Sequence, residues 1–407
     1  MSVKKLTVFM ALIAALSLPS VEAANQEIRA LFQPDSSQPN KNVFVNKTPN
    51  SGYCADFPSE CASNGMFSIR VPIRFSTFTP LFSSNGVWVK VPAAWQVLNV
   101  TNQQTQQTRP VEVRISGIGS RFRLSKPVTE LTGESDVGEA HRKLWEGSSW
   151  VYAAPPCLYS GWGLPSPTTY QFFWKTPVQG SCIKTAAMDV GHMDFEYLDI
   201  AYELRTPDPL TMPTGTYTGA LTYSVGAGGA DFNMGPFFRA DDSSLTLDFV
   251  LDVHHALKVD LPPGGDKVTM EPVGGWQRWI DTGRMPTEIY RDQQFYLSAS
   301  SPFKVMMICN SLGGTECGIG NNEVGFSKFE VKLTLPRGIT GPGNSDGWSG
   351  TLSHNTWLGP FEPTRYVDRK PGTLRFQIPR RWIESLLKPG MNGTLWGNVT
   401  IIFDSEV

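Results

Sequence analysis

The sequence predicts an all-β fold made of two β-sandwich domains. Apolar and polar residues alternate along many short segments, for example residues 67–75, whereas helical spacing is rare. The chain contains 38 glycines and 31 prolines, which is typical of a protein in which many turns connect short strands. Its length of 407 residues exceeds one ordinary domain, so two domains are favoured over a single large sandwich.

The first 23 residues have the pattern of a secretory signal peptide. Two lysines precede the apolar run 6–18, and the residues at 21–23 are typical of a cleavage site. A membrane anchor would need roughly 20 consecutive apolar residues, more than this run contains. We therefore expect residues 1–23 to be removed, so that the exported chain starts near Ala24.

Charge and motifs argue against several functional classes. The formal net charge is −2 and no block of Lys or Arg stands out, so nucleic acid is not an expected partner. No segment matches the GxSxG or HExxH motifs, and we expect no enzyme activity, no metal and no cofactor. Adjacent Asp241 and Asp242 would point to opposite faces of a strand, which does not suit glycoside hydrolysis. A secreted glycosidase is kept as the less favoured alternative.

The cysteine spacing predicts three local disulfides. Six cysteines are an even number, and in an exported chain they are expected to be oxidised. A zinc site is the alternative, but the sequence has no CxxC pair and no paired histidine spacing. Each bridge would stabilise the fold by about 2–4 kcal/mol. The expected disulfides join nearest neighbours: Cys54–Cys61, Cys157–Cys182 and Cys309–Cys317.

A long alternation marks the expected domain boundary. Apolar residues occupy alternate positions from Leu245 to Leu261, which as one strand would extend for about 55 Å, longer than most sandwich domains. We therefore expect the ribbon to leave one domain and enter the next, with the polar pair His254 and His255 at the crossing. The predicted domains are residues 24–253 and 254–407.

The second domain is predicted to be one strand short. It offers about six strands, whereas an immunoglobulin-type sandwich of this size uses at least seven. Its last strand carries Leu395, Val399, Ile401 and Phe403 on one face, and four residues follow. The sheet would remain open beyond this strand unless another chain completed it. A short helix is expected near residues 382–387. The expected strands are 256–261, 267–270, 295–300 continuing to 303–309, 326–335, 373–378 and 395–403.

Several segments of the boundary and the second domain resemble a known family. They are residues 213–225, 245–259, 261–265, 274–276, 291–295 and 399–407. Together with the leader and the local disulfides, they resemble two-domain tip adhesins of chaperone–usher fimbriae, and especially fimbrial-like proteins of enteric bacteria. The resemblance implies that both domains are immunoglobulin-like sandwiches and that the C-terminal one is a pilin domain lacking its last strand.

The resemblance also implies partners and a location. In this family a periplasmic pilus chaperone lends a strand to the pilin domain, and the next pilin subunit replaces it at the outer-membrane usher. The chain would pass through the periplasm to the cell surface and lie at the tip of the fimbrium. The residues expected to border or line the donor-strand groove are Phe329, Val331, Leu333, Leu395, Val399, Ile401 and Phe403.

The start of the mature chain is expected to favour the tip position. Residues 24–32 alternate too weakly to act as a donor strand for another subunit, and residues 24–66 are expected to be polar and irregular. A tip subunit needs no donor extension because no subunit lies beyond it. The sequence therefore favours a tip subunit over a shaft subunit.

An aromatic segment in the first domain is the candidate ligand site. Tryptophan and tyrosine crowd into residues 145–174, with charged residues shortly before them. A host glycan would use exposed aromatic faces and polar groups, although most aromatics in a β-sandwich pack in the core. A structural minor pilin that initiates or caps the fimbria without binding a receptor is the alternative. The candidate ligand residues are Trp145, Trp150, Tyr152, Trp162, Asp136 and Arg142.

Overall fold

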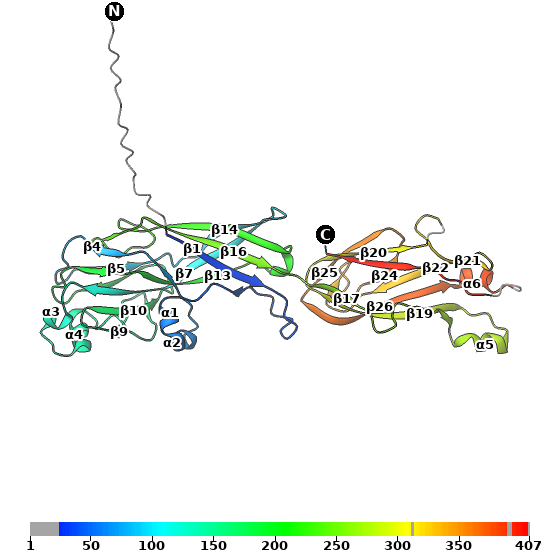
Figure 1. Ribbon diagram of the computed structural model, residues 1–407, viewed down its shortest axis with the longest axis horizontal. Coiled ribbons are helices and arrows are strands. Elements are labelled where there is room, and N and C mark those ends of the chain that lie inside the picture. The colour runs from blue at the N-terminus through cyan, green and yellow to red at the C-terminus, as the bar shows by residue number, and fades with distance from the viewer. Residues whose placement is uncertain (1–23, 311–312, 389–392, 406–407) are drawn as a thin grey trace, which may run out of the picture.

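The chain folds into two β-rich lobes. The computed structural model describes residues 24–310, 313–388 and 393–405. The lobes lie end to end and are joined by one crossing of the chain (Figure 1). Each has its own hydrophobic core: the larger cluster ends at Val253, and the second is built from residues beyond the crossing. The predicted all-β fold with two domains is confirmed, while the boundary between residues 253 and 254 remains a prediction.

The first lobe contains β1 to β16. Its elements are β1 (Ala24–Phe32), β2 (Val45–Asn46), α1 (Tyr53–Asp56), α2 (Pro58–Ser63), β3 (Ile69–Val71), β4 (Phe75–Thr77), β5 (Gly86–Lys90), β6 (Gln96–Asn102), β7 (Thr108–Leu124), α3 (Val128–Thr132), α4 (Val137–Leu144), β8 (Leu158–Tyr159), β9 (Leu164–Pro165), β10 (Thr169–Lys175), β11 (Ser181–Thr185), β12 (Met193–Phe195), β13 (Leu198–Arg205), a 3-10 turn (Pro209–Thr211), β14 (Gly215–Ser224), β15 (Phe238–Ala240) and β16 (Ser244–Val253).

The long strand β7 organises this lobe. It pairs with β6 near its start and with β10, β12 and β13 further along, so four other strands of the same sheet are hydrogen-bonded to it. Its alternate residues Val111, Val113 and Ile115 are fully buried. The main sheet follows the order β15-β4-β12-β7-β6-β14-β16-β1-β2, and β5 with β11 forms a small separate sheet.

Strand β1 closes the first lobe, contrary to the expectation of irregular structure at the start of the chain. It runs parallel to β16, with Ala24 opposite Leu245 and Phe32 opposite Val253. Ile28, together with Phe32, is buried in the core, whereas Asn25, Glu27 and Arg29 are exposed. The alternation is weak because Gln26 and Glu27 precede the first buried residue. The strand is stable because its partner, distant in sequence, completes its hydrogen bonds.

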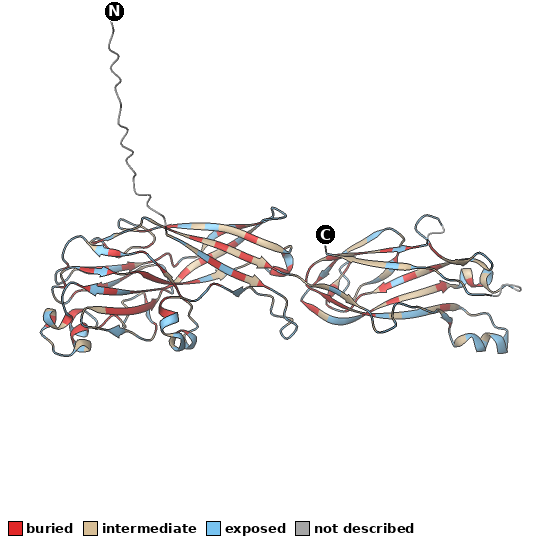
Figure 2. Ribbon diagram, in the orientation of Figure 1, coloured by how far each residue is buried: buried red, intermediate tan, exposed pale blue. Residues whose placement is uncertain are grey.

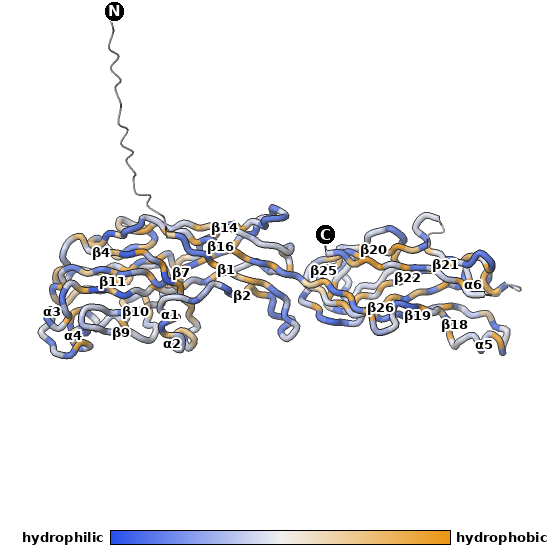
Figure 3. The backbone as a smooth tube through the Cα atoms, viewed as in Figure 1, coloured by the Kyte–Doolittle hydropathy of each residue, from blue (hydrophilic) through white to orange (hydrophobic). Residues whose placement is uncertain are grey.

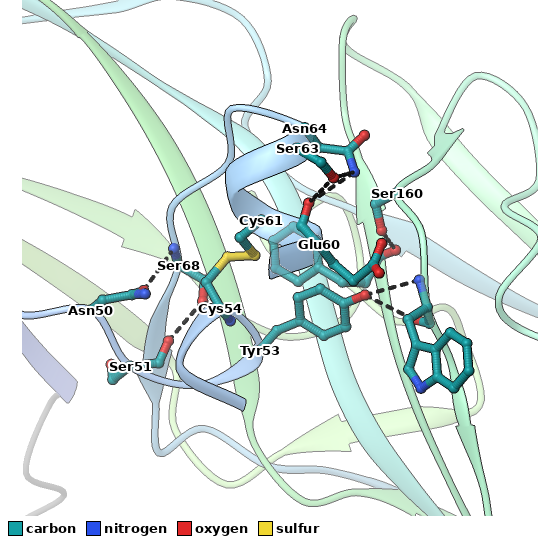
Figure 4. The surroundings of a disulfide bond; sticks show 12 residues. Asn50, Ser51, Tyr53, Cys54, Glu60, Cys61, Ser63, Asn64, Ser68 and Ser160 are labelled. Atoms are coloured by element: carbon teal, nitrogen blue, oxygen red, sulfur yellow. Dashed lines mark hydrogen bonds between the residues drawn. A yellow bond between two sulfur atoms is a disulfide. The ribbon is translucent and has the colours of Figure 1, made fainter. Parts of the chain in front are cut away.

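All three predicted disulfides are present. Their Cα–Cα separations are 5.5 Å for Cys54–Cys61, 5.7 Å for Cys157–Cys182 and 5.6 Å for Cys309–Cys317. The first joins α1 to α2, and Figure 4 shows it beside Tyr53 and Glu60. The second fastens the loop before β8 to β11. The third joins the ends of β20 and β21 in the second lobe.

The second lobe contains β17 to β27. Its elements are β17 (Leu257–Asp260), β18 (Glu271–Pro272), α5 (Gly275–Thr282), β19 (Glu288–Ala299), β20 (Phe303–Cys309), β21 (Cys317–Asn321), β22 (Gly325–Thr334), β23 (Ile339–Thr340), β24 (Ser349–Leu352), β25 (Trp357–Pro363), β26 (Val367–Pro379), α6 (Arg380–Leu386) and β27 (Val399–Asp404).

Two sheets face each other in the second lobe. One has the order β17-β19-β26-β22-β21 and the other the order β23-β25-β20-β27. Their inner residues, among them Phe295, Val305, Val331 and Phe361, form the second core. Buried residues concentrate on the strands, and hydropathy alternates along them (Figures 2 and 3). The predicted short helix is confirmed as α6.

One predicted strand of this lobe is wrong, and several observed strands were missed. Residues 267–270 form no strand, because they run beside an open groove where no described strand lies alongside them. Strands β21, β24 and β25 were not predicted, since their short segments carry few alternating apolar residues. Among the described residues, no helix combines the length and apolar character needed to cross a membrane.

The crossing between the lobes interrupts the long alternation. Strand β16 ends at Val253 and β17 begins at Leu257, so the segment predicted as one ribbon is two strands. His255 lies between them: its Nε2–H donates to the Met212 carbonyl at 2.7 Å, and its Nδ1 accepts from the Ser300 hydroxyl at 3.0 Å. Burial lowers the pKa of His255. The neutral ring therefore bonds one group of each lobe.

Candidate functional site

An open groove separates the two sheets of the second lobe along one side. β17 is the end strand of one sheet and β27 the end strand of the other. Within residues 24–310, 313–388 and 393–405, β17 pairs only with β19, and β27 only with β20. A groove of about 1270 Å³ runs between them. Two one-sided strand edges beside a groove form a template to which a further strand can add.

The groove is lined mainly by apolar side chains. Val259 and Leu261 lie on the side of β17, and Val399 and Ile401 lie on the side of β27. The Phe403 ring approaches the Phe295 ring of the facing sheet at a centroid distance of 5.7 Å. The residues of β27 that line the groove are only partly buried. Apolar side chains left in this state gain stability when a partner covers them.

The structure places five of the seven predicted groove residues along this groove. They are Phe329, Leu395, Val399, Ile401 and Phe403.

The remaining two, Val331 and Leu333, do not line the groove. Both are fully buried in β22, which is covered on both edges by β26 and β24 at these positions. They share the alternation of Phe329 but lie deeper in the core, where the two sheets already cover them. The assignment of Val331 and Leu333 to the groove is corrected on this ground.

Sequence reasoning missed the residues on the opposite wall and the floor. Leu261 and Val259 belong to the long alternation that marked the domain crossing, and this alternation was the signal that could have found them. The floor residues were recognised only as strand residues, because a sequence pattern does not show which sheet face meets the groove. The missed residues include Val259, Leu261, Ile289, Phe295, Leu374, Phe376 and Ile378.

Helix α5 lies at one end of the groove. Trp276 and Trp279 line the groove there, and their rings lie 6.0 Å apart. None of its residues is buried, and Ile280 is 69% exposed. Figure 2 shows the helix mainly in the exposed colour. The apolar groove surface thus continues from the strands onto this helix.

Two of the predicted ligand residues are buried in the first core. Trp145 and Trp150 are 2% and 0% exposed. The Trp150 ring stacks on Trp174 at 5.0 Å, and the Trp174 indole N–H donates to the Trp150 carbonyl at 2.6 Å. The rings of Trp145 and Trp150 both pack against the Phe122 ring. They offer no surface to a ligand, so the structure removes Trp145 and Trp150 from the candidates.

The other four predicted ligand residues are spread over several elements. Tyr152 is 53% exposed and stacks on Tyr159, while Trp162 is 52% exposed. The Tyr53 hydroxyl bonds both the backbone N–H and the carbonyl of Trp162, which fixes the loop that carries this ring. Asp136 precedes α4 and caps its first turn, and Arg142 of α4 pairs with Glu139 of the same helix. The side chains of Asp136 and Arg142 are therefore already bonded to Glu139 of α4.

An ion pair with a buried carboxylate lies close to α1. Arg70 donates two hydrogen bonds to the Asp199 carboxylate, at 2.8 and 2.9 Å, and its guanidinium lies 3.7 Å from the Tyr197 ring centre. Asp199 is fully buried, and burial raises its pKa while the bonded Arg70 opposes that rise. Gly52 leaves room for the carboxylate, since a side-chain carbon there would lie 2.2 Å from it. No sequence pattern pointed to this pair.

Lys184 in β11 is a second buried charge. Its side chain is 2% exposed, and its ammonium donates to the carbonyls of Gly147, Ser149 and Tyr152 at 3.4, 3.3 and 3.1 Å. Burial lowers its pKa to about 8. Two residues earlier on the same strand, Cys182 holds the same loop through its disulfide. β11 therefore fastens the loop that presents Tyr152.

The acidic pair considered for glycoside hydrolysis is engaged with the backbone. Asp241 accepts the N–H of Arg74 at 2.8 Å, and Asp242 accepts the N–H of Ala24 at 2.8 Å and that of Ser244 at 3.1 Å. In the part of the chain that the structure describes, no three His, Cys, Asp or Glu side chains are grouped so as to hold a metal ion.

Comparison with known proteins finds similarity among solved structures. No family model and no curated protein matches it. Among solved structures it is similar to CfaE, the adhesive subunit of CFA/I fimbria of enterotoxigenic Escherichia coli, with 10% identity over 94% of this chain and 92% of that chain and a TM-score of 0.28.

Two chaperone complexes are also similar. One is a chaperone–tip adhesin complex of CFA/I fimbriae, with 12% identity over 94% of this chain and 97% of that chain and a TM-score of 0.28. The other is the CsuC–CsuE pre-assembly complex of Acinetobacter baumannii Csu pili, with 11% identity over 93% and 97% and a TM-score of 0.22. At these identities and TM-scores the similarity is one of fold, and the functional assignment rests on the geometry of the groove.

Proposed function

We propose that this protein is the tip adhesin of a chaperone–usher fimbria. Its second domain joins the fimbria by accepting a β-strand from another subunit, and its first domain binds a surface ligand, a glycan. One observation carries the proposal: an apolar groove lies between two strands that are paired on one edge only, β17 and β27.

The groove provides both kinds of interaction that strand addition requires, backbone hydrogen bonds and side-chain contacts. A strand laid between β17 and β27 gains backbone hydrogen bonds from the open edges, which supply affinity regardless of sequence. Its alternate side chains point to the floor formed by Phe295 and Leu374, and these contacts supply specificity. A strand matched to β27, which has six residues, would be about 20 Å long.

The exposed apolar wall explains why successive partners are needed. In the periplasm a chaperone strand covers Val399 and Ile401 and keeps the edge from pairing with other chains. At the outer-membrane usher the N-terminal strand of the next pilin subunit takes that place. The assembled protein then lies on the cell surface.

The position of β1 supports a terminal place in the fimbria. Residues 24–32 are hydrogen-bonded to β16 and bury Ile28 and Phe32 in the first core. If this segment were donated to another subunit, the first domain would lose the pairing of β1 with β16 and expose its core. The chain therefore accepts a strand without donating this one, as a tip subunit does.

The surface aromatics support ligand binding by the first domain. Tyr152 and Trp162 each present about half of their surface to solvent on loops that are held by Lys184 and Tyr53. Flat aromatic faces pack against the apolar faces of sugar rings, and phenol hydroxyls can bond sugar hydroxyls. The minor-pilin alternative differs in one respect, because it predicts that these surfaces bind no glycan.

Expression in the periplasm tests strand addition. The full chain is produced with and without its cognate chaperone, and a complex of one chain with one chaperone is expected only when both are present. Without the chaperone, degradation or aggregation is expected. Recovery of a stable monomer without any helper would contradict the proposal. The complex is then applied to a printed array of neutral and sialylated oligosaccharides, where binding supports the adhesin and its absence supports the minor pilin.

A further inference from the structure

Asp242 lies beside Ala24, the first residue of β1. The backbone nitrogen of Ala24 donates to one oxygen of the Asp242 carboxylate at 2.8 Å, across 218 residues of sequence. The other oxygen accepts the N–H of Ser244 at 3.1 Å, which fixes the orientation of the carboxylate. Ala24 is also in register with Leu245 of β16. Asp242 is only partly exposed.

We propose that Asp242 is a built-in binding site for the α-ammonium group that leader cleavage creates on Ala24. Hydrolysis of the peptide bond between residues 23 and 24 adds one water, leaving a carboxylate on Ala23 and an amine on Ala24. With an ordinary pKa of about 8, that amine is protonated at neutral pH. The nitrogen already lies at hydrogen-bond distance from the carboxylate, so cleavage converts a neutral amide donor into a charged one.

This site links processing to the sealing of the first domain. β1 is held by hydrogen bonds to β16 and by the burial of Ile28 and Phe32, and its first residue gains an ion pair once the leader is removed. The carboxylate of the neighbouring Asp241 accepts the N–H of Arg74 and is therefore bonded to a different segment of the chain. An added N-terminal residue moves the charge away from Asp242, whereas cleavage after Ala23 places it there.

A double-mutant cycle tests the site on the full chain purified with its chaperone. One axis is Asp242→Asn. The other is the insertion of Gly-Ser between residues 23 and 24, which extends the mature chain and displaces the ammonium. Intact mass gives the N-terminus of each form, and thermal unfolding gives its midpoint. Asp241→Asn serves as the control, because it removes an adjacent carboxylate that bonds only a backbone amide.

The site predicts that Asp242→Asn lowers the midpoint by about 2–4 °C more in the processed chain than in the extended chain. Asp241→Asn should lower both equally. If Asp242→Asn cannot be recovered, the extended chain is compared directly with the processed one and is expected to unfold at the lower temperature. A mature chain that starts elsewhere than Ala24, equal losses in both forms, or equal midpoints for the processed and extended chains would overturn the proposal.

Discussion

Replacing Lys184 by methionine should remove a pH dependence from the stability of the first domain. Burial lowers the pKa of this lysine from 10.5 to about 8. Between these values the unfolded chain binds more protons than the folded chain, so stability rises with pH. Linkage gives a gain of about 2 kcal/mol between about pH 7.5 and about pH 9.5 from this residue alone. Methionine has a similar length and no proton to lose, so its variant should lack that gain.

The assay is equilibrium unfolding in denaturant, followed by near-ultraviolet circular dichroism. Trp150 and Trp174 are stacked in the core of the same domain, so this signal reports on its packing. Lys90→Met is the matched control, since Lys90 lies on the neighbouring strand β5 and also donates to two carbonyls but is only partly buried. The difference between wild type and Lys184→Met should change with pH, and should change more than the difference between wild type and Lys90→Met, because Lys184 is the more deeply buried of the two. A wild-type stability no more pH-dependent than that of Lys184→Met would refute the reasoning.

Three further predictions concern other residues of the two domains. Arg70→Met leaves the buried Asp199 carboxylate without its cation and should destabilise the first domain by about 3 kcal/mol in denaturant unfolding; a loss below about 1 kcal/mol would show that the pair is solvated. Ile401→Asp puts a carboxylate into the groove and should abolish co-purification with the chaperone, whereas Thr400→Asp, on the opposite face of β27, should not; equal recovery of both complexes would contradict the groove. Trp162→Ala should weaken binding on the oligosaccharide array by at least about tenfold and leave the unfolding midpoint unchanged; a lowered midpoint with unchanged binding would show a structural role.

Local sequence patterns predicted the features that depend on nearby residues. The disulfides Cys54–Cys61 and Cys309–Cys317 close short loops, so their pairing follows from spacing. Helix α6 has its own periodicity, and β27 has its own alternation. In each case the interactions that decide the structure lie within a few residues of one another.

The features that sequence analysis missed depend on distant partners. β1 has a weak alternation, but β16 supplies its hydrogen bonds from more than 200 residues away. Trp145 and Trp162 belong to the same aromatic segment, yet one is buried against Phe122 and the other is half exposed. Composition cannot separate them, because the covering residues come from other elements.

The prediction of the groove residues was limited in the same way, although the residues concerned are close in sequence. Phe329 and Val331 share one face of β22, and only Phe329 lines the groove. The difference depends on where the facing sheet ends, which is a property of the packed sandwich. Alternation therefore predicted the wall formed by β27 correctly and extended the groove too far into the core on β22.

Amide hydrogen exchange along β27 tests the strand-acceptor groove most directly. The full chain freed of its chaperone is compared with the same chain after a subunit strand has been added, and exchange is followed at residues 399–404. We expect the amides that point away from β20 to exchange rapidly in the uncomplemented chain and slowly once the strand is bound. If those amides are already protected in a stable chain without any partner, the edge is closed and the groove accepts no strand.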